Sequence, residues 1–141
     1  MMCIDSNIWI YYLSSKAREH KVVAKAMRKI LLEEEIMLNP SIILEVAHYF
    51  RSLPKEKLLK IIDSVISLQN TVFVGLDIPL LQNSVAVLAE YSKLGFGTRD
   101  STILASMRQT GVKRIMTHDA VFEGIEGIEV FDPLRRSSLP T

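Results

Sequence analysis

Four acidic residues, widely separated along the chain, are the side chains best suited to chemistry. They are Asp5, Glu45, Asp100 and Asp119. Asp5 and Asp119 each close a short apolar segment, and Asp100 follows Gly-Phe-Gly-Thr-Arg. Glu45 lies five residues after Pro40. Because the carboxyl ends of parallel strands open into one crevice in an α/β fold, separated acids at these ends can meet. The pattern predicts a shared acidic pocket.

The expected pocket has the chemistry of a divalent-metal site. Carboxylates repel one another by roughly 4 kcal/mol per pair at about 4 Å and an effective dielectric near 20, so we expect a cation among them. Oxygen-only ligands suit Mg²⁺ or Mn²⁺. Such an ion lowers the pKa of water and offsets the charge on a phosphate, as phosphodiester hydrolysis requires. The residue types leave open whether one ion binds or two.

The elements that must position these acids are short apolar segments alternating with amphipathic ones. The alternation favours an α/β fold, a three-layer α/β/α arrangement with a central parallel sheet of about five strands. We treat residues 1–133 as one domain and residues 134–141 as a C-terminal tail. Strands are expected at residues 2–4, 36–38, 71–76, 115–117 and 128–131, and helices near residues 8–13, 18–35, 40–52, 54–66, 78–94 and 100–109.

Three of the acids lie at expected element ends. Asp5 stands between a strand and a helix, where the helix dipole favours a carboxylate, and Ser6 or Asn7 is expected to cap that helix. Asp100 begins a helix, and Asp119 follows a strand. Helix capping is the commoner role of an Asp at such places, so a functional interpretation depends on all the acids acting together.

Glu45 differs from the other acids because it lies within a helix, where capping does not apply. It shares a polar face with Ser41 and His48, and simple solvent exposure is the alternative. The spacing from Glu45 to His48 occurs in di-iron helix bundles, but those sites need it twice, so His48 is interpreted as structural or pocket-lining. Arg99 is expected to be a solvated surface side chain, although a guanidinium can also bind phosphate.

Composition is that of one globular domain. The chain has 141 residues, of which 48% are hydrophobic and 23% charged, which excludes a disordered chain. A net charge of +1 means that any surface for nucleic acid must be local. The single Cys3 excludes an internal disulfide and fits a reducing compartment. With neither a signal-peptide pattern nor a membrane-spanning apolar run, we expect a cytoplasmic protein.

Several segments, in their order and spacing, resemble the PIN domain family, and most closely its compact VapC-type toxin ribonucleases. The resemblance covers residues 2–133. It is carried by Ile4-Asp5-Ser6-Asn7, Pro40-Ser41 through Glu45, Asp100-Ser101-Thr102-Ile103-Leu104-Ala105, Thr117-His118-Asp119-Ala120-Val121-Phe122, and Gly127-Ile128-Glu129-Val130 leading to Pro133.

This resemblance implies a metal-dependent endoribonuclease that hydrolyses RNA. Asp5 and Asp100 would be the main ligands of Mg²⁺ or Mn²⁺, and Glu45 and Asp119 would complete the catalytic set. It also implies a small antitoxin that inserts a basic side chain among the acids, and a homodimer. Residues 8–13 and 84–89 are apolar enough to form such contacts.

Two other functions stay open at this point. One is a degenerate PIN-like module that binds RNA or protein without catalysis, and therefore need not hold a metal. The other is a receiver-type signalling domain, which also places acids at strand ends. That site requires adjacent acids after the first strand and a Lys after the last, and the sequence has neither.

Overall fold

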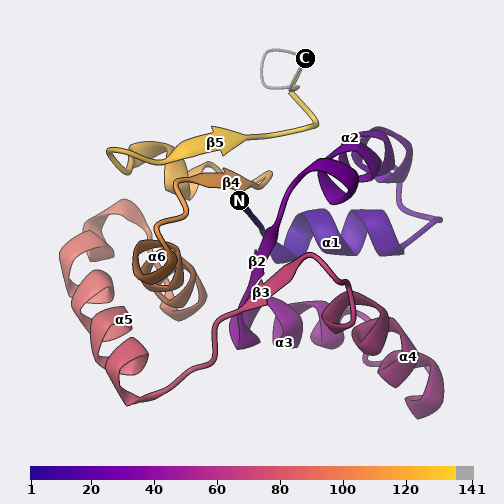
Figure 1. The fold of residues 1–141 in the computed structure, drawn as a ribbon, viewed down its shortest axis with the longest axis horizontal. Coiled ribbons are helices and arrows are strands. Elements are labelled where there is room, and N and C mark those ends of the chain that lie inside the picture. The colour runs from indigo at the N-terminus through magenta and orange to yellow at the C-terminus, as the bar shows by residue number, and fades with distance from the viewer. Residues whose placement is uncertain (136–141) are drawn as a thin grey trace.

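The computed structural model describes residues 1–135, which form a five-stranded parallel sheet between layers of helices (Figure 1). Its elements, in chain order, are β1 (Met2–Ile4), α1 (Ser6–Leu13), α2 (His20–Glu33), β2 (Ile36–Leu38), α3 (Pro40–Tyr49), α4 (Lys55–Ile66), β3 (Thr71–Phe73), α5 (Ile78–Tyr91), the 3-10 turn η1 (Ser92–Leu94), α6 (Thr98–Thr110), β4 (Arg114–Met116), the 3-10 turn η2 (Ala120–Gly124) and β5 (Glu129–Phe131).

The sheet places β1 at its centre, in the strand order β3-β2-β1-β4-β5. Cys3 on β1 lies in register with Met37 on β2 and Ile115 on β4, and all strand pairs are parallel. The carboxyl ends of the strands therefore share one edge of the sheet. Asp5 and Thr117, which follow two neighbouring strands, lie together at this edge.

Helices cover both faces of the sheet, which confirms the predicted three-layer α/β/α architecture. Figure 1 shows α5 and α6 on one side of the strands and α1, α2 and α4 on the other. α3 packs against both α1 and α6. This packing brings the helix that carries Glu45 close to the helix that carries Asp100.

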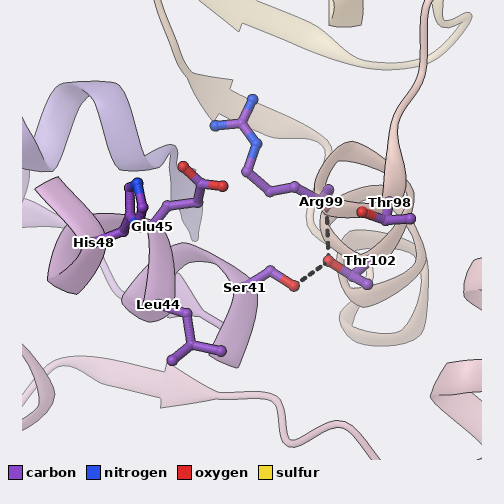
Figure 2. A pocket seen from close by; sticks show the side chains of 7 residues that line it. All are labelled: Ser41, Leu44, Glu45, His48, Thr98, Arg99 and Thr102. Carbon is purple, nitrogen blue, oxygen red and sulfur yellow. Dashed lines mark hydrogen bonds between the residues drawn. The ribbon is translucent and has the colours of Figure 1, made fainter.

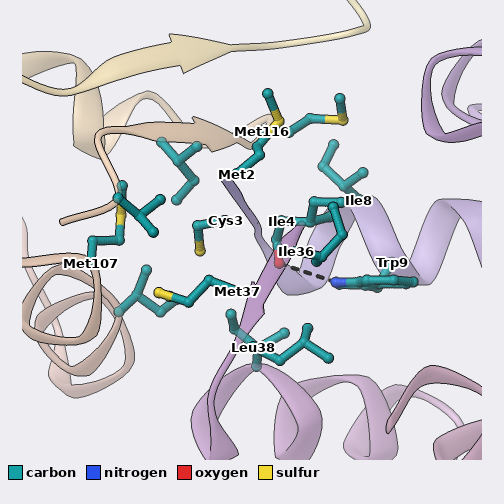
Figure 3. Packing of buried hydrophobic residues seen from close by; sticks show 14 of the residues in the cluster. Met2, Cys3, Ile4, Ile8, Trp9, Ile36, Met37, Leu38, Met107 and Met116 are labelled. Carbon is teal, nitrogen blue, oxygen red and sulfur yellow. Dashed lines mark hydrogen bonds between the residues drawn. The ribbon is translucent and has the colours of Figure 1, made fainter. Parts of the chain in front are cut away.

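The core is built around β1 and β2, which are apolar along their whole length. Met2, Cys3 and Ile4 are fully buried, as expected for a central parallel strand covered on both faces. Trp9 on α1 is also buried, and its indole N–H donates to the Ile4 carbonyl at 3.1 Å (Figure 3). That bond satisfies the polar atom of a large side chain inside the core.

Two helix starts differ from the predictions made from sequence. α1 begins at Ser6, and its N-cap is Asp5, whose side chain accepts from the Ser6 N–H, rather than Ser6 or Asn7. α6 begins at Thr98 after Gly97, so Asp100 lies in the first helical turn instead of at the helix start. Asn39 and Asp77 cap α3 and α5, because each side chain accepts a backbone N–H of the following helix.

The apolar spacing within residues 78–94 predicts that Leu80, Leu81, Val85, Leu88 and Ala89 pack inward, and this prediction is wrong in part. Leu81 and Val85 are 46% and 58% exposed, Ala89 is exposed and Leu88 is half-buried. The helix instead buries Leu80, Ser84 and Val87. Ser84 tolerates burial because its hydroxyl donates to the Leu80 carbonyl at 2.7 Å.

The chain end is described only as far as Arg135. Of the expected tail at residues 134–141, residues 136–141 lie outside the described part of the chain, while Leu134 packs against the core. Among residues 1–135, no helix combines the length and the hydropathy needed to cross a membrane.

Candidate acidic site

Asp5 forms the floor of the candidate site. Its side chain is fully buried at the carboxyl end of the central strand. Oδ1 accepts the Ser6 backbone N–H at 2.7 Å, and Oδ2 accepts the Thr117 hydroxyl at 2.8 Å. Both oxygens are thus held by neighbours that follow β1 and β4, which fixes the direction of the carboxylate. Ser6 and Thr117 thus both donate hydrogen bonds to this acid.

Asp100 and Asp119 lie above this floor on separate elements. Asp100 stands in the first turn of α6, where the Gly97 N–H donates to its Oδ2 at 3.4 Å. Burial raises the pKa of the Asp100 carboxyl above its ordinary value, while the Arg99 charge and the Gly97 N–H oppose that rise. Asp119 caps η2 through the Val121 N–H at 3.0 Å, and its side chain is 39% exposed.

Arg99 lies at the centre of the three carboxylates, which makes its expected role as a solvated surface side chain wrong. Its Nη1 lies 3.3 Å from Asp5 Oδ1 and its Nη2 lies 2.9 Å from Asp100 Oδ1 and 3.5 Å from Asp119 Oδ2. Nη1 also donates to Ser6 Oγ at 2.8 Å. The side chain is only 24% exposed. One planar guanidinium therefore contacts every acid of the cluster.

The charge of Arg99 offsets the repulsion that was expected to require a divalent ion. Partial burial alone lowers the pKa of the guanidinium, but the Asp5 and Asp100 carboxylates raise it above its ordinary value, so the side chain stays charged. The expectation that only a bound metal ion would make the cluster tolerable is thus corrected. The signal in the sequence was the position of Arg99 directly before the third acid.

Glu45 is not part of the cluster around the guanidinium. It is exposed on α3 and lines a neighbouring cavity of about 390 Å³ between α3 and α6. Figure 2 shows Glu45 and Arg99 extending into the space between these helices. The structure therefore brings Asp5, Asp100 and Asp119 together, and it places Glu45 outside this cluster, on the wall of the neighbouring cavity. The cavity is lined by Ser41, Leu44, Glu45, His48, Thr98, Arg99 and Thr102.

The walls of this cavity are linked by hydroxyl groups. Thr102 Oγ1 lies 2.7 Å from Ser41 Oγ and 2.7 Å from the Arg99 carbonyl oxygen, which connects α3 to α6 (Figure 2). His48 lines the cavity, as one of the two interpretations of this residue predicted. Both helices therefore contribute hydroxyl and charged side chains to the cavity, and Arg99 belongs both to the cavity and to the acidic cluster.

A histidine–aspartate pair beside the cluster was not recognised in the sequence. His118 Nδ1 lies 2.8 Å from Asp132 Oδ2, and the His118 backbone N–H donates to Asn7 Oδ1 at 3.3 Å. Asp132 is buried and also accepts the Leu134 N–H at 2.9 Å. The pair fastens the end of β5 to the loop that carries Asp119, which holds that loop in place.

The residues at the cluster fit a divalent cation by donor type, while their present positions fit a guanidinium. Asp5, Asp100 and Asp119 offer the hard oxygen donors that Mg²⁺ and Mn²⁺ prefer. In the described part of the chain, however, no three His, Cys, Asp or Glu side chains are already grouped as a metal-ligand set. The point toward which the three carboxylates converge is taken by Arg99.

Comparison with known proteins gives one family and a consistent fold. The sequence model of the PIN domain family matches residues 2–128. No curated protein sequence matches the chain significantly. Among solved structures, VapC20 of Mycobacterium tuberculosis, described as a sarcin–ricin-loop-cleaving toxin, is 13% identical with a TM-score of 0.75, and the match covers 91% of this chain and 98% of that one.

Two further structures share the fold over similar lengths. FitAcB from Neisseria gonorrhoeae is 17% identical with a TM-score of 0.70, covering 94% of this chain and 98% of the other. A toxin–antitoxin complex from Klebsiella pneumoniae contains a chain that is 19% identical with a TM-score of 0.69, covering 96% and 99% respectively. At such low identities these likenesses establish the fold.

Proposed function

Because the chain belongs to the PIN domain family, we propose that it is a metal-dependent endoribonuclease that acts as the toxin of a toxin–antitoxin pair. The observation that carries the proposal is the meeting of Asp5, Asp100 and Asp119 at the carboxyl edge of the sheet. These residues are far apart in the sequence, and the fold brings their carboxylates to one point.

Each acid would have a definite task in phosphodiester hydrolysis. Asp5 and Asp100 would hold Mg²⁺ or Mn²⁺, because Asp5 is fixed by two hydrogen bonds and Asp100 faces it across the guanidinium. When bound, the ion supplies an activated water and offsets phosphate charge. Asp119 and Glu45 would orient the attacking water and the RNA chain from the more exposed side of the pocket.

The proposed partner of this toxin is a small antitoxin protein, and the toxin itself is proposed to form a homodimer. Support comes from neighbours in fold that are toxins or toxin–antitoxin complexes. The structure adds an exposed apolar face on α5, formed by Ile78, Leu81 and Val85, which a protein partner would cover. Leu44 is a second exposed apolar side chain, and it lines the cavity beside the acids.

The direct test is cleavage of RNA with and without Mn²⁺. Asp5→Asn and Asp100→Asn should each lower the rate by about 100-fold or more, because each removes a charge that would hold the ion. Asp63→Asn is the matched control, since Asp63 is an exposed carboxylate on α4 away from the site. Full activity in both site variants would refute the assignment.

One alternative keeps support from a specific observation. Arg99 neutralises the acids without metal, so the same fold could serve as a module that binds RNA or protein and does not cleave. RNA binding without cleavage in any divalent metal would favour this alternative. The receiver-type alternative loses support, because the strand order found here differs from the 2-1-3-4-5 order of flavodoxin-like folds.

A further inference from the structure

Within residues 1–135, Arg99 is the one side chain in contact with all three carboxylates of the cluster. Its two terminal nitrogens lie 2.9 to 3.5 Å from oxygens of Asp5, Asp100 and Asp119. A guanidinium in this position supplies the positive charge that a divalent ion would otherwise supply. The two cations cannot occupy the convergence point of the same carboxylates at once.

We propose that Arg99 is a built-in counter-ion that competes with the divalent metal, so that metal binding requires the guanidinium to leave the acids. The inference rests on the proposed function, which supplies the divalent metal. Arg99 would then control the affinity of the site for that metal, and this role explains why an arginine of the same chain is paired with the acids.

The structure offers the displaced side chain a second position. Arg99 also lines the cavity of about 390 Å³ between α3 and α6, on whose opposite wall Glu45 lies. A swing toward Glu45 therefore exchanges one set of carboxylate partners for another within the same pocket.

The hydrogen bonds of the pocket leave Arg99 free to make this movement. Within residues 1–135, the guanidinium is held only by the three acids and by Ser6 Oγ. Its backbone carbonyl is held separately by the Thr102 hydroxyl, which joins it to Ser41. Rotation of the side chain thus requires no change in the helix that carries it.

Two consequences of opposite sign follow for a variant without the guanidinium. Without metal, three carboxylates would face one another unpaired, and the free energy of unfolding should fall. With metal, no internal cation competes, and the ion should bind more tightly. A purely structural ion pair would produce the first effect without the second.

The experiment measures Mn²⁺ binding by calorimetry for the wild type, Arg99→Gln and Arg99→Lys, with thermal unfolding in EDTA and in Mn²⁺. Arg99→Gln should bind Mn²⁺ more tightly by about tenfold or more, a common size for coupling between competing ligands. Its melting temperature should be lower than that of the wild type in EDTA, and Mn²⁺ should raise its melting temperature by more than it raises that of the wild type. Arg99→Lys, with one compact charge instead of a fork, should fall between the two.

The matched control is Arg108→Gln. Arg108 lies on the same helix but pairs with Glu90 and the Tyr91 hydroxyl, away from the acids. Its loss should leave Mn²⁺ affinity unchanged. If Arg99→Gln does not fold, the comparison of Arg99→Lys with the wild type still tests the proposal, because Arg99→Lys should bind Mn²⁺ more tightly than the wild type.

The outcomes separate this inference from the proposed function. Equal or weaker Mn²⁺ binding by the Arg99 variants overturns the inference, even if the wild type cleaves RNA and the nuclease assignment stands. Tighter binding supports it, even if the wild type fails to cleave RNA and the nuclease assignment falls. Absence of Mn²⁺ binding in every variant overturns both.

Discussion

At the scale of single residues, Asp5 connects the protein core to the candidate site. It ends the central strand, caps α1 and is fully buried, so its charge needs partners from the protein. Those partners are the Ser6 N–H, the Thr117 hydroxyl and the Arg99 guanidinium. Any change at Asp5 will therefore alter stability as well as chemistry, and its activity must be measured with its unfolding.

Thr117 gives a prediction about the hydrogen bonds that hold Asp5. Thr117→Val keeps the shape but removes the hydroxyl, which donates to Asp5 Oδ2 at 2.8 Å and accepts the Asp119 backbone N–H at 3.0 Å and the Asn7 side-chain amide at 3.4 Å. Leaving that buried oxygen short of a donor should lower the free energy of unfolding by about 1–3 kcal/mol. Urea denaturation measures the loss, and Thr117→Ser, which retains the hydroxyl, should lose much less. Equal losses in the two variants would contradict the hydrogen-bond explanation.

The residues of the site were only partly predictable from sequence. Acids at strand ends signal a pocket because the topology of parallel sheets brings those ends together, and Asp5, Asp100 and Asp119 do meet. The direction of a long side chain such as Arg99 is decided by the charges around it in space. The sequence shows the charged residues but does not show which of them become neighbours in the folded protein.

At the scale of elements, α5 shows why apolar spacing alone cannot assign the buried face of a helix. The stripe through Leu81, Val85 and Leu88 and the stripe through Leu80, Ser84 and Val87 both have helical spacing, and the first is the more apolar. The structure buries the second stripe, which is possible because the Ser84 hydroxyl donates to a carbonyl of its own helix. Packing against α6 decides the choice.

The exposed stripe of α5 carries a prediction about assembly. The double variant Leu81→Gln, Val85→Gln should change the free energy of unfolding by only about 1 kcal/mol or less, because both side chains are exposed. If this stripe is the proposed protein interface, the variant should lose self-association in sedimentation velocity at rising concentration.

The control for this prediction is Leu32→Gln on α2. Leu32 is 87% exposed and undergoes the same change of chemistry on a different helix. It should sediment like the wild type. A wild type that stays monomeric at every concentration and binds no partner, or a double variant that associates normally, would remove the stripe from the proposed interface.

At the scale of the whole molecule, the alternation of short apolar strands with amphipathic helices was enough to predict the layers of the fold. The strands β1 and β2 are so short and so fully apolar that only burial between two helix layers suits them. In the order β3-β2-β1-β4-β5 these two lie inside the sheet, whereas the edge strands β3 and β5 are partly exposed. A short segment taken singly does not show which strand pairs with which.

The same architecture makes the core and the candidate site one cooperative unit, which leads to a prediction for Mg²⁺. Trp9 is buried and bonded to the residue before Asp5, so its fluorescence reports the central strand, whereas far-UV circular dichroism reports all helices. Mg²⁺ at about 100 times its dissociation constant should raise the free energy of unfolding by about 2.7 kcal/mol in both signals equally. Asp5→Asn should lose this gain. A shift in one signal alone would show that ion binding stabilises a local region and leaves the sheet unaffected.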